Sequence, residues 1–140
     1  MRIIFVLLIG LMLGACQHKQ HSSATHNTHK YSVAGTNKTA VTSFLAQLKT
    51  AAKKNSSSMF SKLISFPLRV NAHHRTVFVS KRRFIKQYKQ IFTGALKKII
   101  LASDAGTLFV NSQGVMLGNG QIWFRPSGKA QSLKIFVVNQ

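Results

Sequence analysis

The sequence of 140 residues contains one cysteine, Cys16, and one acidic side chain, Asp104. A single cysteine excludes a disulfide within the chain. A single acid excludes catalysis by a pair of carboxylates. It also leaves almost no partners for the 20 Lys and Arg residues. Burial of apolar side chains and backbone hydrogen bonds, rather than ion pairs, must therefore stabilise the fold.

The apolar run near the start of the chain is short. It extends from Ile3 to Leu13 and follows Arg2, the only charge before it. A helix that spans a membrane needs about 20 apolar residues, so this run is too short. A positive start, a short apolar core and small residues at its end are typical of a secretory signal peptide. We predict that residues 1–15 are a cleaved leader.

The end of this leader is the segment Leu13-Gly14-Ala15-Cys16. The segment resembles the lipobox of bacterial lipoproteins. This resemblance implies that Cys16 receives a diacylglyceryl thioether, that the leader is cut before it and that the new amino group is acylated. Two or more acyl chains anchor a protein stably, because each buried methylene contributes about 0.8 kcal/mol. The alternative is an ordinary cleaved leader with an incidental cysteine.

The residue after the cysteine is Gln17, whereas an Asp at that place retains enteric lipoproteins at the inner membrane. The resemblance therefore implies an outer-membrane protein that faces the periplasm.

Residues 16–38 are predicted to be a disordered tether after the lipidated cysteine. Only Tyr31 and Val33 are bulky and apolar, so the stretch cannot bury enough surface to offset its ordering entropy. Histidines can bind zinc, copper or nickel, but neither a second cysteine nor an acid supports them here. We expect no metal and no cofactor, and we treat as incidental the four tether histidines, which are His18, His21, His26 and His29.

Residues 39–140 are predicted to form a single α+β domain. The hydrophobic periodicity and the Ser, Gly and Pro positions predict helices near 39–55, 59–64, 81–92 and 95–100. The same signals predict strands near 66–70, 75–79, 107–111, 115–117, 121–124 and 133–138. The last strand ends at Asn139-Gln140 and is expected to be central or well paired.

Several motifs of this domain follow one another in a recognisable order: Phe66-Pro67-Leu68, Phe84-x3-Tyr88-x2-Ile91-Phe92, Leu108-Phe109-x-Asn111-x2-Gly114-x-Met116-x-Gly118-x-Gly120-x-Ile122-Trp123, and Lys134-Ile135 with Asn139. The pattern resembles exported bacterial members of the nuclear transport factor 2-like superfamily. The resemblance implies helices packed on a long, curved antiparallel sheet, a cone-shaped cystatin-like roll. A pocket in the cone is expected to be lined by Phe109, Met116 and Trp123, with ordinary core packing as the alternative.

The same resemblance bears on catalysis. Enzymes on this roll use an Asp base, with a tyrosine or a protonated Asp as hydrogen-bond donor. Here the only acid, Asp104, lies in a predicted loop, where it is expected to cap a turn. The remaining acid–base candidates, His73 and His74 beside Arg75, lie at a predicted turn and are expected to be exposed. We therefore expect a protein that is not an enzyme.

The formal net charge of +19 indicates an anionic partner. Charges of one sign attract anions over about 8 Å at physiological salt. An exported protein seldom encounters nucleic acid. The expected partners are lipid phosphates, lipopolysaccharide phosphates, cell-wall carboxylates or an acidic protein. A solvated helix face with no partner is the alternative. The candidate binding residues are Lys81, Arg82, Arg83, Lys86, Lys89, Lys97 and Lys98.

The function expected from the sequence is that of a membrane-anchored, non-catalytic envelope lipoprotein, whose basic domain binds an anionic envelope component or an acidic protein. The alternatives are an immunity or inhibitor protein against a toxin or hydrolase, and a binder of a small ligand in the cone pocket.

Substitution of Cys16 tests the anchor. We expect Cys16→Ser to abolish labelling of the protein by a radioactive fatty acid and to release it from the membrane fraction, because the variant has no thiol to lipidate. A variant that stayed membrane-bound and labelled like the wild type would contradict the lipobox interpretation.

Overall fold

The computed structural model describes residues 29–140. The predicted leader, Cys16 and the tether histidines His18, His21 and His26 lie outside this part of the chain. A 3-10 turn and four α-helices occur in it: η1 (Ser32–Ala34), α1 (Lys38–Lys53), α2 (Ser57–Lys62), α3 (Lys81–Ile91) and α4 (Gly94–Ala102). The strands are β1 (Ile64–Ala72), β2 (Arg75–Val79), β3 (Phe109–Asn111), β4 (Gly114–Leu117), β5 (Ile122–Ser127) and β6 (Ser132–Asn139).

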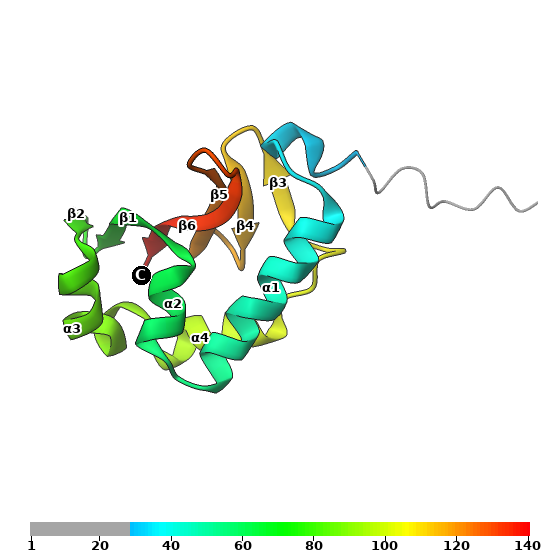
Figure 1. Cartoon of the computed structure of the whole chain (residues 1–140). Coiled ribbons are helices and arrows are strands. Elements are labelled where there is room, and N and C mark those ends of the chain that lie inside the picture. Colours follow the sequence, from blue (N-terminus) through cyan, green and yellow to red (C-terminus); the bar gives the residue numbers. More distant parts are fainter. Residues whose placement is uncertain (1–28) are drawn as a thin grey trace, which may run out of the picture.

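The strands form one six-stranded sheet in the order β2-β1-β6-β5-β4-β3. Figure 1 shows α1, α2 and α4 gathered on one side of this sheet. The α+β class is confirmed, and so is the central position of the last strand, because β6 lies between β1 and β5. The sheet is open at β2 and β3 and does not close on itself.

The predicted all-antiparallel sheet is wrong in one pair. β1 and β6 run parallel, whereas the other pairs are antiparallel. Hairpins dictate antiparallel pairing for β1–β2 and for the meander β3 to β6. No hairpin connects β1 to β6, since α3, α4 and four strands separate them along the chain, and their relative direction was not encoded in a local turn.

Uncharged side chains cap all four α-helices. Asn37 accepts a hydrogen bond from the Ala40 amide at 2.9 Å, and Ser56 accepts one from the Met59 amide at 3.2 Å. Ser80 and Thr93 cap α3 and α4 in the same way, each at 3.4 Å. None of these helices carries an acid in its first turn. The helices therefore begin at amide and hydroxyl caps, which are the residue types preferred at this position.

Aromatic rings connect the helices to the sheet and to one another. Phe44 of α1 packs on Phe124 of β5, with ring centroids 4.8 Å apart. Phe92, after α3, lies 4.3 Å from Phe60 of α2 and 5.9 Å from Phe84 of α3. Aromatic pairs contribute about 0.5–1.5 kcal/mol beyond the area they bury, so these contacts fix α3 against α2 and the core.

The ordered domain begins earlier than the predicted boundary at residue 39. Tyr31 is only 1% exposed, and Ala34 is also buried. The hydroxyl of Tyr31 donates a hydrogen bond to the backbone carbonyl of Ala105. The prediction that the tether extends to residue 38 is therefore wrong for its last residues. The polar composition of residues 16–38 did not indicate that Tyr31 is buried. Tyr31 packs into a core that is formed by residues far away in the sequence.

Two substitutions test the role of Tyr31. Tyr31→Ala is expected to lower the free energy of unfolding by about 3–5 kcal/mol, because it removes a large buried ring. Tyr31→Phe, which removes only the hydrogen bond to Ala105, should cost about 1 kcal/mol. Denaturant unfolding measures both effects.

The matched control is Val33→Ala, since Val33 is nearby and 55% exposed. This substitution should change the stability by about 0.5 kcal/mol or less. If Tyr31→Ala were as mild as Val33→Ala, residues 31–34 would not belong to the folded domain.

Candidate anion-binding surface

Helix α3 carries five basic residues in eleven positions, and all five side chains are exposed. Phe84, Tyr88 and Ile91 of the same helix are buried. The predicted site residues on this helix are thus all exposed, and Arg82, Lys86 and Lys89 among them lie opposite its apolar stripe. The five residues are Lys81, Arg82, Arg83, Lys86 and Lys89, and we call them the α3 surface.

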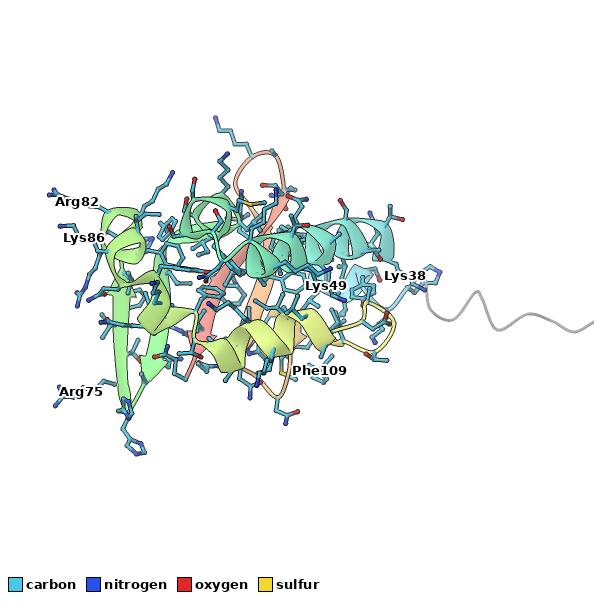
Figure 2. The ribbon with its side chains drawn as sticks, turned by 90° about the horizontal axis from the view of Figure 1, so that it is seen from below. Lys38, Lys49, Arg75, Arg82, Lys86 and Phe109 are labelled. Carbon is cyan, nitrogen blue, oxygen red and sulfur yellow. The ribbon has the colours of Figure 1, made fainter. Side chains whose placement is uncertain are left out.

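Figure 2 shows the side chains of Arg82 and Lys86 pointing away from the protein at one end of the molecule. Arg75 lies at the same end, whereas Lys38 and Lys49 of α1 lie toward the other end. Arg82, Lys86 and Lys89 recur at intervals of four and three residues. These three cations therefore share one face of the helix.

The beginning of α3 concentrates positive charge. Lys81, Arg82 and Arg83 occupy the first turn, where the helix dipole is positive, and cations there are disfavoured by about 0.3–1 kcal/mol each. The only acid, Asp104, accepts a hydrogen bond from the Gly106 amide at 2.7 Å within its own loop. A bound anion would relieve this repulsion.

Hydrogen bonds from distant parts of the chain hold α3 in place. The Tyr88 hydroxyl donates to Asn55 Oδ1, which follows α1, at 3.2 Å. At the end of the helix, Gln140 Nε2 donates to the carbonyls of Gln90 and Ile91 at 2.6 and 2.9 Å. Burial raises the pKa of Tyr88, so its hydroxyl remains a donor across the physiological range. The backbone that carries the α3 surface is consequently held in a fixed position.

Lys97 and Lys98 of α4 differ in their surroundings. The Nζ of Lys97 donates to Asn55 Oδ1 at 2.6 Å and lies 5.4 Å from the centre of the Tyr88 ring. Lys97 therefore borders α3, but its ammonium group already has partners. Lys98 is exposed, about 100° further around α4. The structure thus brings Lys97 to Tyr88, on the buried side of α3, and among residues 29–140 it gives no contact that joins Lys97 or Lys98 to the five cations of the α3 surface.

The histidine candidates lie apart from this surface. His73 and His74 form the turn of the β1–β2 hairpin, where both residues are exposed and have positive φ angles of 48° and 62°. His29 is exposed before η1. Within residues 29–140, no group of three or more His, Cys, Asp or Glu side chains is placed to hold a metal ion.

The predicted pocket residues do come together. Phe109, Met116 and Trp123 occupy paired positions on β3, β4 and β5. The Phe109 and Trp123 rings meet edge to face with centroids 6.3 Å apart. Their neighbours Ile122 and Phe124 are buried, so the three residues lie on the sheet face turned away from the helices. Their role in ligand binding stays a prediction.

Sequence reasoning missed Asn55, Gln140, Arg125 and Phe136. Arg125 lies over the Phe136 ring, 4.3 Å from its centre. Strand alternation around Phe124 places Arg125 on the outer face, so that signal was present. The bonds from Asn55 and Gln140 to α3 left no local signal, because they connect residues at least 33 positions apart.

Comparisons with protein-family models, with curated proteins and with solved structures found no match. Among residues 29–140, no helix is both long enough and apolar enough to cross a membrane. The functional argument therefore depends on the geometry of this chain.

The hairpin turn offers a stability test. Ala72 pairs with Arg75, so His73 and His74 form a two-residue loop with both φ angles positive, which Asn-Gly favours. We expect His73→Asn with His74→Gly to raise the free energy of unfolding by about 1 kcal/mol, because it relieves two non-glycine residues of positive φ angles. Calorimetry measures the change, and binding to anionic vesicles should stay unchanged. A loss of vesicle binding in this variant would make the turn part of the site.

Proposed function

We propose that this protein is a non-catalytic, lipid-anchored protein of the bacterial envelope whose α3 surface binds an anionic envelope component, with phosphate-bearing lipid surfaces favoured over an acidic protein partner. The supporting observation is the set of five exposed cations on one helix whose opposite face is anchored in the core. No acid of residues 29–140 lies on that helix.

The proposed interaction is electrostatic. Each Lys or Arg near an anionic membrane surface contributes about 1 kcal/mol, and several such residues together make a useful affinity. Arginine can also bind a phosphate through two parallel hydrogen bonds. A fixed helix presents these groups without a further cost for ordering the backbone, which favours binding.

The location is part of the proposal. Lipidation of Cys16 would place the domain at the membrane, facing the periplasm if the host has an outer membrane. The cone-shaped roll of the nuclear transport factor 2-like superfamily remains our proposal for the fold family. A non-catalytic role is supported by the place of Asp104 in a turn and by the exposure of His73 and His74.

Neutralising one face of α3 tests the function. In the full chain carrying Cys16→Ser, the triple variant Arg82→Gln, Lys86→Gln and Lys89→Gln should bind vesicles of phosphatidylglycerol and phosphatidylcholine about 100-fold more weakly. Three contacts of about 1 kcal/mol each give this factor. Vesicle sedimentation measures the binding, which should also disappear near 0.5 M salt, where the screening length falls to about 4 Å.

The matched control removes the same charge elsewhere: Lys38→Gln, Lys49→Gln and Lys129→Gln. It should weaken binding about threefold or less, since these lysines act only through the screened field. Equal losses in both triple variants would show that net charge, and not α3, is responsible. Wild-type protein that ignored anionic vesicles but captured an acidic protein through α3 would replace the membrane surface by that protein as the partner.

A further inference from the structure

The sheet face turned away from the helices carries a continuous row of paired residues. The pairings Phe78–Arg69, Arg69–Val137, Val137–Trp123, Trp123–Met116 and Met116–Phe109 connect all six strands, from one edge to the other. Directly paired residues project from the same face of a sheet. We call this set the outer row: Phe78, Arg69, Val137, Trp123, Met116 and Phe109.

Five of the six residues of the outer row are apolar; those on the two edge strands are exposed, and those between them are half-buried or buried. Phe78 is 63% exposed and Phe109 is 52% exposed. Val137 is only 2% exposed, yet it does not belong to the hydrophobic core cluster under the helices. From Val137 to Phe109 the row crosses three strand spacings of about 4.8 Å, a path of about 14 Å. Trp123 and Met116 are half-buried along this path, and a contiguous apolar path that is partly open to solvent is a candidate binding site.

A hollow of about 580 Å³ opens beside Val137. Arg69, Phe78, Arg125 and Phe136 line it. The guanidinium of Arg125 lies over the Phe136 ring, 4.3 Å from its centre, which orients this group at the hollow. The apolar path of the row therefore ends at two arginines.

Within residues 29–140, these arginines form no salt bridge with an acidic side chain. The only acidic side chain, Asp104, is engaged in its own loop. A planar guanidinium matches the oxygens of a phosphate or carboxylate, so the pair selects an anionic group. The ligand that satisfies both features has an anionic head for the arginines and an apolar part for the row.

Charge argues against a second copy of this chain as the occupant. Two copies would bring surfaces of the same strong positive sign together, and like charges in contact cost several kcal/mol. A small phosphate ion would leave the apolar path uncovered. We propose that the outer face binds a single-chain anionic lipid, with its head at Arg69 and Arg125 and its hydrocarbon chain along Val137, Trp123 and Met116.

This site is separate from the α3 surface and does not depend on it. Phe84, Tyr88 and Ile91 of α3 belong to the hydrophobic core, whereas no residue of the outer row belongs to it. The proposal therefore stands or fails independently of vesicle binding by α3.

The only tryptophan of the chain, Trp123, lies in the row and reports on the ligand. In the full chain with Cys16→Ser, monomeric lysophosphatidylglycerol should shift Trp123 emission to shorter wavelength in a saturable titration. Lysophosphatidylcholine of the same chain length should bind about tenfold more weakly or worse, because its head group is not a net anion. Glycerol phosphate, which has no chain, should leave the emission unchanged.

Variants locate the site. Arg69→Gln with Arg125→Gln should weaken the lysophosphatidylglycerol titration about tenfold or more. Arg69→Lys with Arg125→Lys, which keeps the charge but loses the planar fork, should fall in between. The control Arg82→Gln with Lys86→Gln should titrate as the wild type while its vesicle binding falls. Unfolding curves show that each variant is folded.

Equal affinity for the two lysolipids, or equal losses in the Arg69/Arg125 and Arg82/Lys86 variants, would overturn the proposal. So would a response to glycerol phosphate alone, or an acidic peptide that bound the outer face more tightly than the lipid.

Discussion

The near absence of acids constrains every level of this structure. Because 20 basic side chains face one carboxylate, ion pairs cannot organise the fold, and repulsion between cations opposes compaction. Uncharged groups take over the tasks that acids often perform. Asn37, Ser56, Ser80 and Thr93 begin the helices, and amides join distant segments, as Asn71 does when it donates to Asn139 at 2.7 Å. Aromatic packing around Phe60 and Phe92 supplies the remaining cohesion.

The same constraint leaves the cations of α3 without acidic neighbours, because the only acid, Asp104, is bonded within its own loop. On a surface of mixed charge, neighbouring acids would neutralise α3. Here no acid lies on that helix, so its positive electrostatic potential is not reduced in this way. Long-range hydrogen bonds of Tyr88 and Gln140 fix the position of the helix, so its charged residues form a defined surface. On strands β1 and β5, Arg69 and Arg125 are likewise unopposed, but there they border apolar residues. One imbalance of composition thus produces two surfaces with different chemistry.

Local signals predicted the parts of the fold that local interactions determine. The His73-His74 turn and the amphipathic pattern of α3 follow from neighbouring residues, and the structure confirms them. Long-range features escaped prediction. The burial of Tyr31 depends on the Ala105 loop, and the parallel β1–β6 pair depends on the packing of the intervening helices. The cations of the α3 surface were predictable, whereas the Asn55 and Gln140 contacts that fix the helix were not.

Backbone amide chemical shifts recorded during titration with phosphatidylglycerol nanodiscs would test the central claim most directly. If α3 is the binding surface, amides of residues 81–91 should respond first, while those of α1 around Lys38 and Lys49 stay unchanged at the same lipid concentration. A uniform response over all basic segments, or a response centred on α1, would contradict the assignment of anion binding to α3.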